Sequence, residues 1–192
     1  MADNFTTTDA SSGTVTLRAS DDSTAKSAVV VSSMAYPSQT MTRTADTNAY
    51  AANDSVNSSV SSPTVMTFTG CARANGMGGS IEGCELVIDE KNTTPAEFHL
   101  WLFNASPTAT NDNAAFAPST GDSNKVVAHL IFTAADMSDG TNSRLYSAVN
   151  CPKVFQCAGG TTSLYGVMQT RTAYTPASGI TYQFTLAIRQ ET

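Results

Sequence analysis

The segment that most constrains the fold of this chain is residues 180–189, ITYQFTLAIR. Large apolar side chains stand at every second position from Ile180 to Ile188, and small or polar residues stand between them. Successive side chains of a β-strand point to opposite faces, so this period of two predicts a strand with one face in a core and the other in water. Such a strand is typical of the outer layer of a β-sandwich.

Strand-forming runs recur upstream, with turn residues between them, at residues 65–69, 80–90, 97–103, 125–132, 145–149, 153–157 and 163–174. The run at 97–103 is apolar at both parities, which predicts a strand that is buried on both faces in the middle of the sandwich. Turn residues, and not helical segments, separate these strands, which argues against βαβ units. The sequence therefore predicts an all-β protein, a single sandwich over residues 37–192 that can take the form of a jelly roll.

Three local features refine this expectation. The glycine-rich turn at 75–79 lies between the runs 65–69 and 80–90, which predicts a hairpin with a long loop. Gly166 lies inside a run and predicts a β-bulge. Residues 104–124 are rich in Asn, Asp and Pro, and predict a long loop with one helical turn around residues 113–116.

Residues 1–36 differ from the rest of the chain and predict an N-terminal extended arm. The first dozen residues are polar and are expected to be mobile or extended, because they have little apolar surface to bury. Val15–Leu17 and Val29–Val31 are short apolar runs, and we expect them to form short strands added to the edge of a sheet. Pro37 marks the expected start of the sandwich domain.

Composition and charge exclude several classes of function. The chain contains 28 Thr, 22 Ser and 26 Ala, and only 14% of its residues are charged. Its net charge is −6 and it has no Lys/Arg cluster, which argues against a nucleic-acid partner, since such binding depends on neutralising phosphates. No apolar run approaches the ~18 residues of a membrane span. The N-terminus lacks the pattern of a signal peptide, so synthesis in a cytosol is expected.

The four cysteines and two histidines do not form a metal motif. None of the cysteines is part of a CxxC pair, and His99 and His129 are far apart in sequence, so we expect no zinc site. Two disulfides are conceivable, but synthesis in a cytosol favours free thiols. Both histidines stand among apolar neighbours and are expected to be structural. The cysteines concerned are Cys71, Cys84, Cys151 and Cys157.

Carboxylates and motifs offer no catalytic constellation either. Glu82 and Glu85 have opposite parity, so a regular strand would place them on different faces. Four loop aspartates, Asp112, Asp122, Asp136 and Asp139, lack a calcium-binding spacing. No phosphate-binding loop or nucleophile elbow occurs. Asn-x-Ser/Thr at Asn4, Asn53, Asn57, Asn92 and Asn104 is expected by chance in so Ser/Thr-rich a chain. We therefore expect no catalytic, cofactor-binding or metal-binding residues, no cofactor and no enzymatic activity.

Three motifs carry a resemblance to a known family. They are Ala49-Tyr50-Ala51-Ala52-Asn53-Asp54-Ser55-Val56, Leu102-Phe103-Asn104-Ala105-Ser106-Pro107-Thr108 and Tyr174-Thr175-Pro176-Ala177-Ser178-Gly179. In this order and spacing, over residues 40–189, the chain resembles small virion structural proteins of tailed bacteriophages. Family members commonly have Gly at position 53, and Asn53 still permits a left-handed turn. None of the three motifs is catalytic.

The resemblance implies a capsid decoration or cement protein, located in the virion after assembly in the bacterial cytoplasm. Its partners would be the major capsid protein and itself as a homotrimer, with neither nucleic acid nor membrane involved. Residues 1–36 lie outside the match, and we expect them to contact the capsid or an adjacent subunit because they are Ser/Thr-rich and carry the β-prone run Val29–Val31. The alternative is a receptor- or carbohydrate-binding module, or a glycan-active enzyme, on a fibre. In that case Trp101 and several tyrosines would be exposed in one groove.

Overall fold

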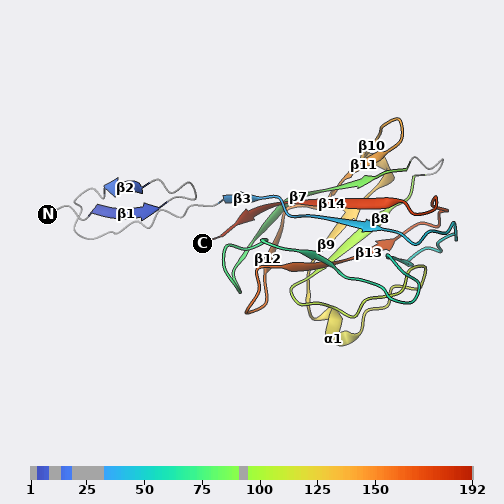
Figure 1. Ribbon diagram of the computed structural model, residues 1–192, viewed down its shortest axis with the longest axis horizontal. Coiled ribbons are helices and arrows are strands. Elements are labelled where there is room, and N and C mark those ends of the chain that lie inside the picture. Colours follow the sequence, from blue (N-terminus) through green and yellow to red (C-terminus); the bar gives the residue numbers. More distant parts are fainter. Residues whose placement is uncertain (1–3, 9–13, 19–32, 91–94, 192) are drawn as a thin grey trace. The chain divides into compact units, whose positions relative to one another are not determined.

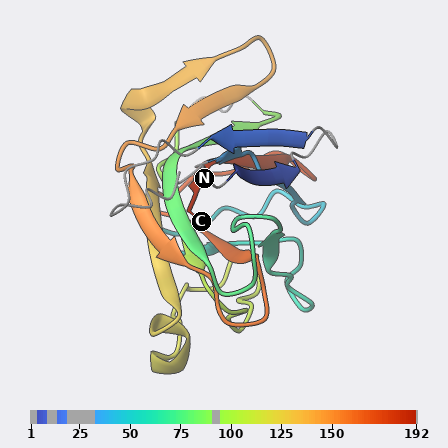
Figure 2. The same ribbon diagram turned by 90° about the vertical axis from the view of Figure 1, so that its left-hand side faces the viewer.

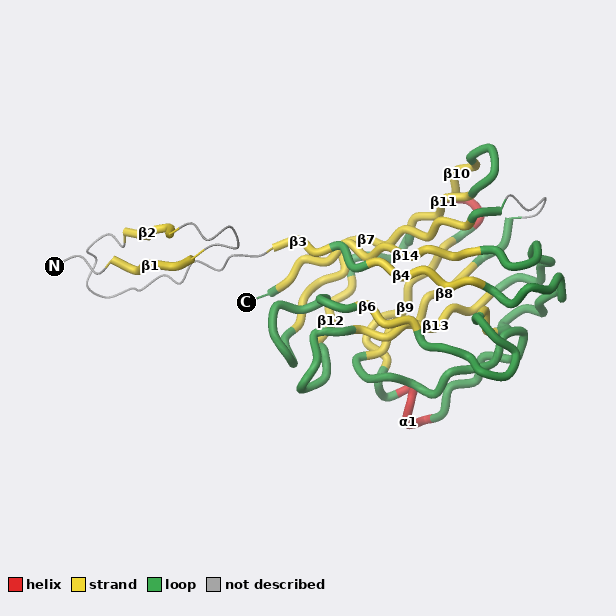
Figure 3. The backbone as a smooth tube through the Cα atoms, in the orientation of Figure 1, coloured by secondary structure: helices red, strands yellow, loops and turns green. Residues whose placement is uncertain are grey.

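A computed structural model of the chain describes residues 4–8, 14–18, 33–90 and 95–191. The chain divides into two compact units, Met1–Val30 and Val31–Thr192. The larger unit is built from two antiparallel sheets (Figure 1). Figure 3 shows how little helix the chain contains. The prediction of an all-β sandwich is confirmed.

The seven-stranded sheet has the order β10-β11-β7-β14-β3, with β12 also pairing with β7 and β4 with β14. Two long strands, β7 and β14, form its centre. Its members are β3 (Ser33–Ala35), β4 (Ser38–Thr42), β7 (Gly78–Ile88), β10 (Met137–Asp139), β11 (Arg144–Ser147), β12 (Lys153–Gln156) and β14 (Thr181–Gln190).

The five-stranded sheet has the order β5-β13-β8-β9, with β6 also pairing with β13. As predicted, β8 lies between two neighbours, and five of its six residues are buried. The members are β5 (Ser55–Val56), β6 (Met66–Phe68), β8 (Phe98–Phe103), β9 (Val126–Phe132) and β13 (Leu164–Thr170).

The core lies between the inner faces of these two sheets. Phe132 of β9 and Phe184 of β14 meet across it, with ring centroids 5.9 Å apart. The alternation read from residues 180–189 holds, because Tyr182, Phe184, Leu186 and Ile188 are completely buried and the residues between them are not. Burying side chains of this size contributes roughly 1.5–3 kcal/mol each.

Three local predictions were wrong. β6 and β7 lie in different sheets, so the segment with Asn75–Gly79 connects the two layers and does not close a hairpin. Gly166 pairs in regular register with Leu102 and Met66, and the physical reason for a glycine is close packing, since a Cβ there would lie 2.8 Å from the Phe68 ring.

The third error is the helical turn. Asn113 adopts a left-handed backbone with φ 57°, which interrupts a right-handed helix. The short helix α1 (Thr120–Ser123) forms further along the same loop, at the bottom of Figure 2. Ser119 caps it by accepting a hydrogen bond from the Asp122 backbone N–H, as Ser does at helix N-termini. A single 3₁₀ turn, η1 (Ala134–Asp136), precedes β10.

The N-terminal unit contains an antiparallel pair of strands, β1 (Asn4–Thr8) and β2 (Thr14–Arg18), with Asn4 opposite Arg18 and Thr8 opposite Thr14. Residues 4–8, which were expected to be mobile or extended, form a β-strand. β3, which the sequence assigned to the arm, pairs with β14 in the sandwich. The expected strand at Val29–Val31 falls outside the described residues.

Candidate functional site

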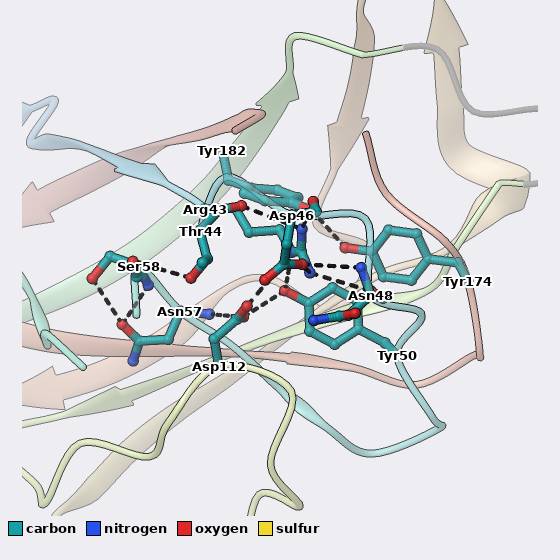
Figure 4. A network of polar contacts seen from close by, with 10 residues as sticks. All are labelled: Arg43, Thr44, Asp46, Asn48, Tyr50, Asn57, Ser58, Asp112, Tyr174 and Tyr182. Carbon is teal, nitrogen blue, oxygen red and sulfur yellow. Dashed lines mark hydrogen bonds and ion pairs between the residues drawn. The ribbon is translucent and has the colours of Figure 1, made fainter. Parts of the chain in front are cut away.

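A buried polar cluster joins loops from three parts of the chain and is drawn in Figure 4. We call it the Arg43 cluster; its ionisable members are Arg43, Asp46, Tyr50 and Asp112. The side chains of Arg43 and Asp112 are both fully buried, with Arg43 Nε 3.6 Å from Asp112 Oδ2. Arg43 Nε also donates to the Tyr50 hydroxyl at 2.7 Å, and that hydroxyl donates to Asp112 Oδ1 at 2.5 Å. The triangle of three side chains is therefore closed.

Electrostatics keep Arg43 and Tyr50 each in one protonation state. Burial by itself lowers the pKa of Arg43, but the hydrogen bonds to Tyr50 and Asp46 outweigh it and the pKa of Arg43 is raised. Burial, assisted by nearby Tyr174 and Asp112, raises the pKa of Tyr50 far above its usual range. Arg43 therefore stays charged and Tyr50 stays a neutral donor at physiological pH.

Two of the three motifs singled out in the sequence, the first and the last, meet at this cluster. Tyr50 of the first motif stacks on Tyr174 of the last, with ring centroids 5.1 Å apart, and its backbone N–H donates to the Tyr174 carbonyl. Asp112 follows the central motif and accepts from the Asn57 backbone N–H at 2.9 Å. The first and the last motif are thus contact points between distant loops.

The other loop aspartates are also held by protein groups. Asp122 contacts Lys125 Nζ at 2.8 Å, and this hydrogen bond is the main cause that lowers the pKa of Asp122 to about 2. Asp136 accepts from the Thr133 hydroxyl, and Asp139 pairs with Arg144 at 2.8 Å. Within the described residues, no three His, Cys, Asp or Glu side chains lie close enough together to hold a metal ion.

The strand pairing brings His99 and His129 together, although 29 positions separate them in the sequence. His129 Nε2 lies 2.8 Å from His99 Nδ1, and His99 Nε2 lies 3.2 Å from Glu97 Oε1. Trp101 is directly opposite His129 in the β8–β9 register, and the two rings stack at 4.1 Å. We call Glu97, His99, Trp101 and His129 the histidine cluster.

Both imidazoles are neutral at physiological pH. Burial lowers the pKa of His99 to about 4, and the Arg171 charge acts in the same direction. Burial also lowers the pKa of His129 to about 4, together with the nearby His99, Lys153 and Arg171. Sequence reasoning treated each histidine separately. The sequence shows that His99 and His129 each lie in an apolar, strand-forming run. It does not show the register between the two strands, which brings the histidines together.

The two glutamates considered for catalysis lie differently from the prediction. β7 has a bulge at Glu82, since Gly83 pairs with Ala187 and Ile81 with Ile188. The extra residue shifts the parity, so Glu82 and Glu85 both lie on the solvent-facing side of the sheet. Glu82 is bound to Arg189, whose Nε donates to it at 2.9 Å. The two carboxylates therefore do not face each other across a cleft.

All four cysteines are free thiols, and three of them are buried. Burial raises the pKa of Cys71 to about 12 and also raises those of the other three. The reactive form of cysteine is the thiolate, so these side chains behave as small apolar residues. Among the Asn-x-Ser/Thr sites, Asn53 has φ 74°, as the left-handed turn expected there requires.

The solvent-facing side of the seven-stranded sheet holds a shallow depression of about 260 Å³. Small residues are among those that line it, namely Gly83, Ala148 and Ala187, together with Tyr36, Glu85 and Thr185. Exposed apolar side chains are spread over the same face, namely Met34, Tyr36, Val87, Leu145 and Val154. This open, flat surface is suited to contact with a macromolecule more than to enclosing a small substrate.

Trp101 is not placed for stacking on a sugar. It is partly buried between His129 at 4.1 Å and Phe116 at 5.5 Å, and its Nε1 donates to Gln169 Oε1. Among the residues whose side chains are described, Tyr36 is the aromatic residue with an exposed side chain.

The helices of the described segments are too short to span a bilayer. Comparison of the chain with models of protein families, with curated proteins and with solved structures found no match.

Proposed function

We propose that this chain is a non-enzymatic virion structural protein of a tailed bacteriophage, a decoration protein that binds and reinforces the outer surface of the capsid. In this proposal the sandwich is a rigid body on the particle, the major capsid protein is its partner, and residues 1–30 are the anchor. The copies assemble as homotrimers, because closed symmetric oligomers multiply weak contacts at equivalent sites.

The division of the chain into two units is the observation that carries this proposal. β1 and β2 pair with each other, and no third strand joins them among the described residues. An isolated two-stranded sheet is only marginally stable in water. Each of its outer edges offers backbone groups to which a strand of another protein can add. The unit therefore has the form of an attachment segment.

The polar residues of the sandwich give further support. Arg43 and Asp112, Asp122 and Lys125, and Glu82 and Arg189 are joined in pairs that stabilise loops or strands. Tyr50 of the first motif bonds to both members of the Arg43–Asp112 pair and stacks on Tyr174 of the last motif. We place the carbohydrate-binding alternative second, because it needs aromatic side chains exposed along one groove, and Trp101 is packed between Phe116 and His129.

The test is binding to heads of the phage that encodes the chain, prepared without this protein. We expect the full chain to sediment with the heads and to occupy many equivalent sites in cryo-electron microscopy. Deletion of residues 1–30, which leaves β3 in the sandwich, should weaken binding by about 10-fold or more, since one of the linked contacts is lost. Circular dichroism of the truncated chain shows whether the sandwich remains folded.

A full-length Val60→Ser chain, changed only at an exposed loop residue, serves as the control and should bind like the original. Equal binding of the truncated and full chains would remove the anchoring role of residues 1–30. Density for the protein at tail tips alone, or turnover of a glycan, would contradict the decoration proposal as a whole.

A further inference from the structure

One hydrogen bond of the histidine cluster joins His129 Nε2 to His99 Nδ1. It can exist only while a single proton lies between these two nitrogens. At neutral pH the Glu97 carboxylate can only accept, so His99 Nε2 donates to it. His99 Nδ1 is then the acceptor, and His129 Nε2–H donates to it at 2.8 Å. Protonation of both rings would place two N–H donors face to face at this distance.

The groups around the two histidines do little to compensate a second positive charge. Glu97 is the carboxylate that faces the pair, and it contacts His99 on the side away from His129. Arg171, which follows β13, and Lys153 of β12 are the cations that act on the pair, and both repel an additional proton. His99 is only 7% exposed, so water does not screen this repulsion effectively.

Contacts extend from this hydrogen bond to the adjoining loops. His129 stacks on Trp101, which donates to Gln169, and Gln169 Nε2 donates to the Asn53 carbonyl at 3.4 Å. The same carbonyl accepts from the Phe116 backbone N–H at 3.0 Å, and the Phe116 ring lies against Trp101. Displacement of His129 would therefore release Trp101 and the loop segment that carries Phe116.

We propose that His99 and His129 form an acid-sensitive latch on the outer face of the five-stranded sheet. While the pair holds no more than one proton between the rings, it keeps β8, β9 and the Phe116 segment together around Trp101. When both rings are protonated, the shared hydrogen bond breaks and this part of the surface opens. The sandwich core, on the other side of the sheet, is not part of the latch.

Trp101 is the only tryptophan of the chain, so its fluorescence reports on the latch directly. We expect the emission of the full-length protein to change in one step as the pH falls from 7 to 3, with a midpoint near pH 4. The far-UV circular dichroism signal should stay constant over that step. His129→Gln and His99→Gln should each abolish the step, because neither retains a pair of rings to protonate.

Glu82→Gln is the matched control, since it removes a carboxylate that lies on the other sheet. This variant should retain the step. An unchanged step in His129→Gln, or no step in the original protein, would overturn the latch. A loss of circular dichroism that coincides with the step would overturn it as well, because acid would then be unfolding the whole sandwich.

Nuclear magnetic resonance of the imidazoles gives a measurement that does not depend on the variants folding. The chain has only two histidines, so their signals can be followed without ambiguity. We expect two coupled titration steps, with the second proton entering well below the ordinary histidine pKa of about 6.5. Two independent titrations near pH 6.5 would contradict the proposal.

Discussion

At the scale of single residues, the buried charges of Arg43 and Asp112 compensate each other. Arg43 and Asp112 have no exposed side-chain surface, and the energetic cost of removing such ions from water is several kcal/mol each. The Tyr50 hydroxyl bridges the two, and Asp46 supplies a second carboxylate to Arg43 at 2.7 Å. These contacts join the loops around residues 43–58 to the loop that carries Asp112. They therefore hold these loops in one conformation.

Replacement of Asp112 by alanine is expected to lower the free energy of unfolding by about 3–5 kcal/mol, because Arg43 then lacks its buried partner. The measurement is chemical denaturation followed by circular dichroism. Asp136→Ala removes an exposed carboxylate bound to Thr133 and should cost less than about 1 kcal/mol. Equal effects of the two substitutions would mean that Arg43 is compensated by Asp46 alone.

At the scale of elements, β7 is the strand on which the seven-stranded sheet depends. It pairs with β14 along one edge, and with β11 and β12 along the other. It begins with two glycines where its neighbours come close, and a Cβ at Gly79 would lie 2.5 Å from the Arg189 carbonyl oxygen. Further along, the bulge at Glu82 lets the strand bend and turns Glu82 toward Arg189.

Two alanine substitutions on this strand should have opposite effects. Gly79→Ala is expected to cost about 2 kcal/mol of stability or more, since backbone atoms must move to admit the methyl group. Gly83→Ala meets no atom within 4 Å and should be neutral or stabilising by up to about 1 kcal/mol, because alanine loses less entropy on folding. Thermal unfolding of both variants checks the pair, and a destabilised Gly83→Ala with an unaffected Gly79→Ala would contradict this account of the strand.

At the scale of the whole molecule, the chain combines a sandwich with a small separate unit. The sandwich has a closed core between two sheets, and one outer face carries exposed apolar residues around a shallow depression. In the proposed assembly, this face contacts the other copies in the trimer, and the N-terminal unit contacts the particle.

We expect sedimentation equilibrium of the full chain to give three times the mass of one chain. Val154→Asp, which places a charge at the most exposed apolar side chain of that face, should shift the equilibrium toward monomers if the face forms the trimer contact. Tyr36→Ser is a second test at the edge of the depression. A monomer for the original chain at all concentrations would contradict the homotrimer.

The sequence alone was sufficient for the fold class and for much of the strand content. Two patterns predicted which strand faces are buried: the alternation from Ile180 to Ile188, and the run at 97–103 that is apolar at both parities. Burial of a strand face depends on the residue types within that strand, so it can be predicted locally.

Only the tertiary structure decided which strands are neighbours. The assignment of β6 and β7 to different sheets, the bulge at Glu82, and the meetings of His99 with His129 and of Arg43 with Asp112 all depend on register between distant segments. Register results from the joint packing of both sheets, and a shift of one residue would turn the side chains of a strand, His99 and His129 among them, to the opposite face. Residue types therefore predicted where the strands are, while the clusters that they form required the assembled sandwich.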